Sequence, residues 1–144
     1  MTADHPDLDV ICITEYWLQE DSFEYLNLKN FRLEFKFCRK IKKHGGSRIF
    51  VRSTLQAKPY TKFVNNSCEE HYEASMVELT QLNTIIICIY RTPASNIQIF
   101  INNLDITLQE ILKINNKKVI ILGDFNINFL NSNIDPNLDR KSVV

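Results

Sequence analysis

An apolar run that stops at a Gly-Asp-Phe-Asn segment constrains this chain more than any other feature. Residues 119–122 are Val, Ile, Ile and Leu, and Gly123 follows them directly. An apolar run of this length bounded by glycine predicts a strand buried on both faces. The carboxylate of Asp124 and the carboxamide of Asn126 then stand at the carboxyl end of that strand, where rigid sheets present functional side chains.

The chemistry of Asp124 and Asn126 suits reactions of phosphate esters. A carboxylate supplies a hard oxygen for Mg²⁺ or a base for water. A carboxamide supplies a neutral donor that can hold a phosphate oxygen. A structural interpretation stays open, in which the strand is followed by an ordinary Asp/Asn turn and both side chains bond to the local backbone.

Two further apolar runs also end in polar side chains. The run over residues 7–14 is followed by Glu15, and the run over residues 84–89 is followed by Tyr90 and Arg91. If the first strand is a neighbour of the strand before Asp124, the carboxylates of Glu15 and Asp124 converge at one end of the sheet. The guanidinium of Arg91 is shaped to hold phosphate through two parallel hydrogen bonds. Taken singly, each of these residues is equally compatible with a solvated or core-capping role.

The rest of the chain predicts two hairpins and one helix. One hairpin joins residues 31–37 to 48–53 through Gly45 and Gly46, and the other joins residues 72–79 to 84–90. Apolar residues at helical spacing predict a helix over 96–114, capped by Ser95 with Gln98 in a capping box. By alternation we expect Phe31, Leu33, Phe35 and Phe37 to face inward. We interpret Glu73 and Glu78 as solvent-facing.

Composition fits one soluble globular domain without an overall affinity for polyanions. The 144 residues are 44% hydrophobic and 24% charged, with a formal net charge of zero. A basic cluster over residues 39–48 is interpreted as a solvated hairpin tip, which as a DNA contact would position phosphates without reading bases. No signal peptide or membrane span is evident, and no Cys-x-x-Cys pair suggests zinc. We therefore expect an intracellular protein, nuclear or cytoplasmic, that is not secreted and has reduced thiols.

Four motifs in a fixed order resemble the endonuclease/exonuclease/phosphatase superfamily. They are Thr-Glu-x-Trp-Leu at 14–18, Gly-Gly-x-x-Ile-x-Val at 45–51, Ile-Tyr-Arg-x-Pro at 89–93 and Ile-x-Gly-Asp-Phe-Asn at 121–126. The chain looks most like the endonuclease domain of a non-LTR retrotransposon, and the resemblance runs from about Asp7 to about Asn131. It implies an α/β fold, a partial four-layer sandwich of the DNase-like type. It also implies a DNA endonuclease that depends on Mg²⁺ or Mn²⁺.

The resemblance assigns a role to each matching residue. It implies that Glu15 binds the metal and that Tyr90 contacts the region of the scissile phosphate. Asp124 is implied to orient or deprotonate the attacking water, and Asn126 to hold the phosphate. Arg91 and Asn96 lie in the loop that approaches the nucleic-acid backbone in similar proteins.

The chain also departs from the family pattern. Residues 1–5 leave no room for the family's first strand with its Asn, and none of His5, His44 and His71 matches the terminal Asp-His pair. We therefore expect residues 1–144 to form a single incomplete domain. Two hypotheses for the function of the chain follow. It is a phosphodiesterase fragment that nicks DNA as in retrotransposon target-site cleavage, or it is a catalytically dead remnant that binds nucleic acid weakly. DNA is the expected partner, with no membrane and no obligate protein partner.

Overall fold

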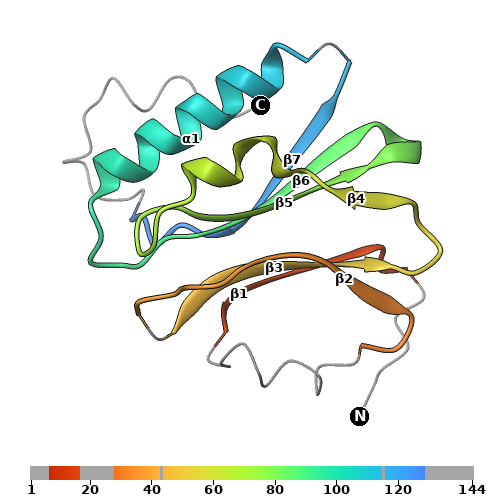
Figure 1. The fold of residues 1–144 in the computed structure, drawn as a ribbon, viewed down its shortest axis with the longest axis horizontal. Coiled ribbons are helices and arrows are strands. Elements are labelled where there is room, and N and C mark those ends of the chain that lie inside the picture. The colour runs from red at the N-terminus through yellow and green to blue at the C-terminus, as the bar shows by residue number, and fades with distance from the viewer. Residues whose placement is uncertain (1–6, 17–27, 43, 115, 129–144) are drawn as a thin grey trace.

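The fold consists of three layers built from two facing sheets and one helix. The computed structural model describes residues 7–16, 28–42, 44–114 and 116–128. Figure 1 shows the sheet of β1 to β3 on one side, the sheet of β4 to β7 in the middle, and α1 over the outer face of that second sheet. The elements are β1 (Val10–Tyr16), β2 (Phe31–Phe37), β3 (Gly45–Arg52), β4 (Ala57–Pro59), the 3₁₀ helix η2 (Thr61–Asn66), β5 (Glu73–Leu79), the 3₁₀ helix η3 (Thr80–Leu82), β6 (Thr84–Tyr90), α1 (Ile97–Leu112) and β7 (Lys118–Asp124).

The first sheet is antiparallel with the strand order β1-β3-β2. The predicted hairpin of β2 and β3 is confirmed, but the predicted alternation along β2 is wrong. A register shift between Leu33 and Phe35 interrupts the pairing, so Leu33 is 38% exposed while Phe35 packs against the core between the sheets. A bulge of this kind adds one residue to a strand and resets which face each later side chain occupies.

The second sheet has the order β4-β5-β6-β7, with β5 and β6 antiparallel and β6 and β7 parallel. The predicted second hairpin is confirmed, and its turn ends at Asn83 in the left-handed conformation. A parallel pair requires a long crossover, which α1 supplies between β6 and β7. Among the parts of the chain that the structure describes, no helix is long and apolar enough to cross a membrane.

Helix α1 begins one residue later than the predicted cap requires. Asn96 is the N-cap, and its side-chain Oδ1 accepts hydrogen bonds from the backbone N–H groups of Gln98 and Ile99. The predicted cap at Ser95 is wrong, because the Ser95 hydroxyl donates to the Thr92 carbonyl instead. Either residue type caps helices well, so tertiary contacts decided between them.

The core has two parts that share β6. Alternate residues of β6 (Ile85, Ile87 and Ile89) pack beneath α1, while Ile86 and Cys88 pack between the two sheets. The β6 strand is therefore buried on both faces, as its unbroken apolar sequence predicts. Packing on both faces fixes the position of the residues at its carboxyl end, where Tyr90 lies.

Candidate active site

Three polar residues form a row across the second sheet. Glu73 pairs with Tyr90 in the β5–β6 ladder, and Tyr90 pairs with Asp124 in the β6–β7 ladder. Residues opposite one another in neighbouring strands point to the same face of a sheet. That face is turned toward the first sheet, because the backbone N–H of Gly46 in β3 donates to the Glu73 carboxylate.

Glu15 approaches the row from the first sheet. It is the penultimate residue of β1, it is exposed, and its backbone is left-handed with φ of 52°. Such a conformation is sparsely populated for a residue of this type and tends to occur at functional sites. Burial raises the pKa of Tyr90, and the adjacent Glu15 carboxylate raises it further by charge and by a hydrogen bond. Glu15 and Asp124 thus lie at the same end of the molecule, on facing sheets and not on neighbouring strands.

The Gly-Asp-Phe-Asn segment turns sharply after β7. At Gly123, with φ of 146°, an added Cβ would lie 1.9 Å from the carbonyl oxygen of Ile89, so only glycine fits. Asp124 Oδ1 accepts the backbone N–H of Asn126 at 3.1 Å, and Asn126 is left-handed with φ of 49°. The structure therefore contains the ordinary Asp/Asn turn that the sequence left open as an alternative to a functional role. The hydrogen bond of this turn holds the Asp124 carboxylate in place.

Arg91, which directly follows β6, binds the turn after the neighbouring strand β7. It is 4% exposed, and its Nε and Nη2 donate to the carbonyl oxygens of Phe125 and Asn126 at 2.8 and 2.7 Å. Its Nη1 donates to the carbonyl and the hydroxyl of Ser95 at 2.7 and 2.9 Å. Asn126 Nδ2 donates in return to the Arg91 carbonyl at 2.7 Å. Burial lowers the pKa of the Arg91 guanidinium, while the charge of Asp124 opposes this. The guanidinium is thus engaged by carbonyl groups, a structural role that sequence reasoning did not anticipate. Its contact with nucleic acid stays a prediction.

Glu73 and Glu78 are buried, which overturns the expectation that both face solvent. Glu73 has no exposed surface, and Glu78 is 7% exposed. Their charges are matched by partners distant in sequence: Arg39 Nε lies 2.5 Å from Glu73 Oε1, and Lys117 Nζ lies 2.5 Å from Glu78 Oε1. The position of Glu73 opposite Tyr90 is set by strand pairing, so no signal in the sequence marked it as part of this row.

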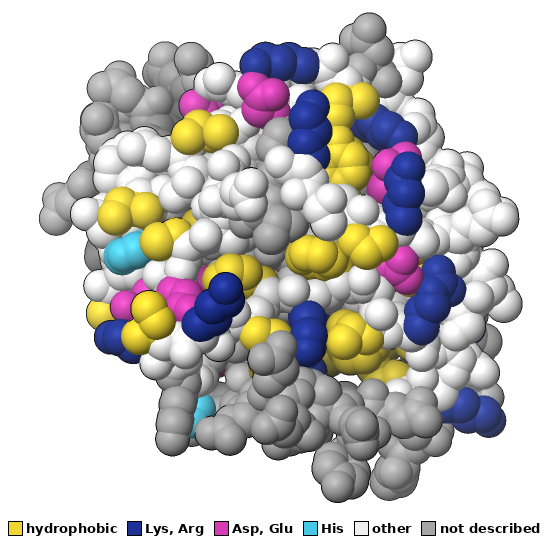
Figure 2. Space-filling view, in the orientation of Figure 1, with side chains coloured by type: hydrophobic (Ala, Val, Ile, Leu, Met, Phe, Trp, Pro, Cys, Tyr) yellow, Lys and Arg dark blue, Asp and Glu magenta, His cyan; other side chains and the backbone are white. Residues whose placement is uncertain are grey.

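The basic cluster is not a uniformly solvated tip. Arg48 is buried with its guanidinium carbon 3.6 Å from the centroid of the Tyr16 ring, and the Arg39 side chain is 6% exposed, whereas Lys40 and Lys42 are exposed. On the face shown in Figure 2, Lys and Arg side chains are interleaved with acidic and apolar ones and form no continuous basic surface. Asn96, the other predicted nucleic-acid contact, is exposed at the start of α1, with its side chain used as the cap.

The cysteines behave as the apolar context predicts. Cys88 is buried between the sheets, and Cys12 packs against the same cluster. No group of three or more His, Cys, Asp or Glu side chains suited to a metal ion occurs within residues 7–16, 28–42, 44–114 and 116–128.

The fold therefore has two facing sheets that carry Glu15 and Asp124 at the ends of their strands. This arrangement can now be compared with known families. The sequence profile described as the Endonuclease/Exonuclease/phosphatase family matches residues 2–139. The match spans nearly all of the 144 residues, so the chain belongs to this family. No curated protein matches the chain. The predicted family and α/β fold are confirmed, and the likeness to retrotransposon endonucleases stays a prediction.

Proposed function

We propose that the chain is a metal-dependent phosphodiesterase that cleaves the DNA backbone, as in target-site nicking by non-LTR retrotransposons. The observation that carries the proposal is the convergence of Glu15, Tyr90 and Asp124 from facing sheets. The left-handed backbone of Glu15 at this same end adds support, since a strained residue of this type tends to occur at a functional site.

The side chains have complementary tasks in hydrolysis. Asp124, fixed by the N–H of Asn126, accepts a proton from the attacking water. The Tyr90 phenol is protonated at neutral pH and carries a single O–H, which is directed at Glu15. Once Glu15 holds a metal ion, this O–H would turn to a phosphate oxygen. Asn126 gives one amide N–H to the Arg91 carbonyl, which orients the amide and leaves the second N–H for the phosphate.

The residues present are compatible with Mg²⁺ or Mn²⁺. Mg²⁺ in phosphate-processing sites is held by one or two carboxylates and completes its octahedral shell with water and substrate oxygens. Glu15, an exposed carboxylate beside Tyr90, would hold the ion in this way. When bound, the ion neutralises charge that builds up on the phosphate.

The second candidate is a catalytically inactive remnant that binds nucleic acid weakly. The observation that favours it is the placement of the two described histidines. His71 Nδ1 accepts the backbone N–H of Asn96 at 3.3 Å, and His44 is exposed beside the β2–β3 turn. Neither belongs to the row of Glu73, Tyr90 and Asp124, so neither supplies an acid to the leaving oxygen.

A plasmid-nicking assay separates the two candidates. Supercoiled DNA is incubated with Mg²⁺ and either the wild-type chain, Asp124→Asn, Glu15→Gln or Asp105→Asn, an exposed helix control. We expect Mg²⁺-dependent conversion to open circles, with loss of a positioned base lowering the rate by ~10²–10⁴-fold in Asp124→Asn. The control should nick at the wild-type rate. Wild-type protein that shifts DNA on a gel without nicking it would support the remnant instead.

Calorimetric titration of Mg²⁺ tests the metal assignment independently of turnover. Glu15→Gln should weaken Mg²⁺ binding, whereas Asp105→Asn should leave it unchanged. Equal affinities in wild type and Glu15→Gln would remove Glu15 from the metal site.

A further inference from the structure

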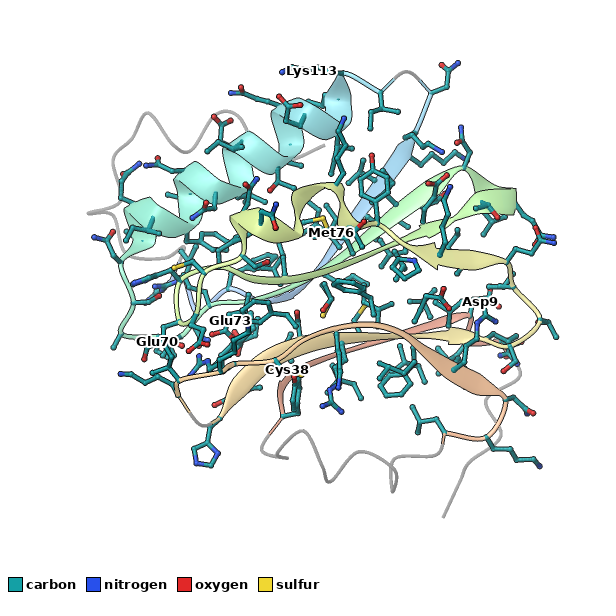
Figure 3. All side chains as sticks on the ribbon, in the orientation of Figure 1. Asp9, Cys38, Glu70, Glu73, Met76 and Lys113 are labelled. Carbon is teal, nitrogen blue, oxygen red and sulfur yellow. The ribbon has the colours of Figure 1, made fainter. Side chains whose placement is uncertain are left out.

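Glu73 is a buried carboxylate whose oxygens are all occupied by donors. Oε1 accepts from Arg39 Nε at 2.5 Å and from the backbone N–H of Glu70 at 2.6 Å. Oε2 accepts from the backbone N–H of Gly46 at 2.5 Å. Figure 3 shows Glu73 between the two sheets, close to the ends of the strands. One carboxylate therefore ties together β5, the segment after β2 and the start of β3.

Arg39 extends this connection to the candidate active site. Its Nη2 donates to the hydroxyl of Thr92, two residues beyond Tyr90, at 2.7 Å. Its guanidinium carbon lies 5.8 Å from the centroid of the Tyr90 ring, within the range of a cation–π contact. The Tyr90 phenol thus has the Arg39 cation near its ring and the Glu15 carboxylate near its hydroxyl.

The ion pair of Glu73 and Arg39 explains why two glycines occur at positions 45 and 46. An added Cβ at Gly45 would lie 2.2 Å from Arg39 Nε, so Gly45 leaves room for the guanidinium. Gly46, with φ of 91°, adopts a backbone that favours glycine and presents its N–H to Glu73. Both glycines are therefore required by the buried pair as well as by the turn itself.

We propose that the Glu73–Arg39 ion pair is a positioning element of the candidate active site, which holds Tyr90 and the Gly45–Gly46 turn in the geometry that the substrate phosphate needs. The side chain of Arg39 is 6% exposed and that of Glu73 is fully buried, so the pair acts through Tyr90 and not by touching substrate. The consequence for catalysis rests on the proposed function, whereas the consequence for Tyr90 can be measured without turnover.

The first test follows Tyr90 and Gly46 by NMR at one fixed pH. Protein labelled with ¹³C in the tyrosine rings and ¹⁵N in glycine is compared with Arg39→Met, and Tyr90→Phe assigns the tyrosine resonance. Because Arg39 lies against the Tyr90 ring and binds the carboxylate that accepts the Gly46 N–H, Arg39→Met should move both resonances. Arg52→Met, which removes an arginine from the far end of β3, should leave both in place. Unchanged resonances in Arg39→Met overturn the proposal.

A second variant covers the case in which Arg39→Met does not fold. Arg39→Lys keeps the charge beside Glu73 but removes the planar fork that joins the Glu73 carboxylate to the Thr92 hydroxyl. The Tyr90 resonance should move in this variant too. A resonance identical to that of the wild type would show that Tyr90 does not depend on how the residue at position 39 is held, which overturns the proposal.

Turnover then separates positioning from simple stabilisation. With equal amounts of folded protein, Arg39→Met should lower kcat for Mg²⁺-dependent cleavage about 10- to 100-fold, because small misplacements of a catalytic group are costly. KM should stay within about twofold, and Arg52→Met should match the wild type. A shifted Tyr90 resonance with wild-type kcat would overturn the positioning role. If the wild-type chain does not cleave DNA, the proposed function fails, and the NMR comparison of Tyr90 and Gly46 at fixed pH decides the proposal.

Discussion

Replacing Arg91 with methionine tests whether its guanidinium is a contact for DNA or a structural latch, by which we mean a group that holds the turn after β7 in place. Methionine keeps much of the length and apolar contact but removes the donors to three carbonyl oxygens and one hydroxyl. An acceptor left unsatisfied in a largely buried position costs about 1–3 kcal/mol. With water reaching some of these groups, we expect a total loss of about 3–5 kcal/mol, a large part of the ~5–15 kcal/mol that stabilises a typical domain.

Two measurements on Arg91→Met decide between the roles. Urea unfolding followed by circular dichroism gives the change in stability, and binding to a short DNA duplex over a range of salt gives the dependence of affinity on salt. A lost phosphate contact would reduce the slope of log K against log salt by about 0.9, whereas a latch leaves that slope unchanged. Lys118→Met, at the exposed start of β7, controls for the loss of one positive charge. A stability change below about 0.5 kcal/mol, together with a reduced salt slope, would refute the latch.

Further predictions concern the turn after β7 and Glu78, one of the two buried acids of β5. Gly123→Ala should destabilise the protein by roughly 2–6 kcal/mol, because positive φ and a Cβ driven into the Ile89 carbonyl both add strain; a midpoint in urea equal to that of the wild type would contradict the steric argument. The hydrogen bond from Lys117 lowers the folded-state pKa of Glu78, and the charges of Lys117 and Lys58 assist against burial. The pair therefore contributes stability that is present above the unfolded carboxyl pKa of about 4.3 and is lost as pH falls through the lower folded-state value. Glu78→Gln should flatten this acid limb of a stability-against-pH curve, and an unaltered limb would show that another carboxyl group is responsible.

The sequence alone identified the elements with the strongest periodicity. Residues 84–90 are an apolar run that forms a strand buried on both faces. The predicted burial of the 119–122 run on both faces is wrong, because β7 is the last strand in the order of the described sheet and leaves Ile120 46% and Leu122 43% exposed. The spacing of Phe100, Leu104 and Ile111 gives the helical face that packs on this sheet. Boundaries and caps were less certain, since Ser95 and Asn96 are both good caps and only the contact of Ser95 with Arg91 and Thr92 separates them.

Burial of charge was the main error of the sequence reasoning. Charged residues are usually solvated, and nothing local distinguishes Glu73 from an exposed strand residue. A buried carboxylate is tolerated only when donors surround it, and here the main donor is Arg39, 34 positions away. The same reasoning applies to Arg91, whose acceptors at Phe125 and Asn126 lie about as far along the chain.

What the sequence by itself determined is the local chemistry: apolar strands, a crossover helix, and Glu15, Tyr90 and Asp124 at strand ends. These follow from short-range patterns of hydrophobicity, glycine and turn residues. Only the tertiary structure decided that β1 joins β3 and not β7, so that Glu15 and Asp124 belong to different sheets and are linked through Tyr90. It also decided which charges are buried. Strand pairing and ion pairing join segments that are far apart in the sequence, and a local sequence pattern does not show which distant segments will meet.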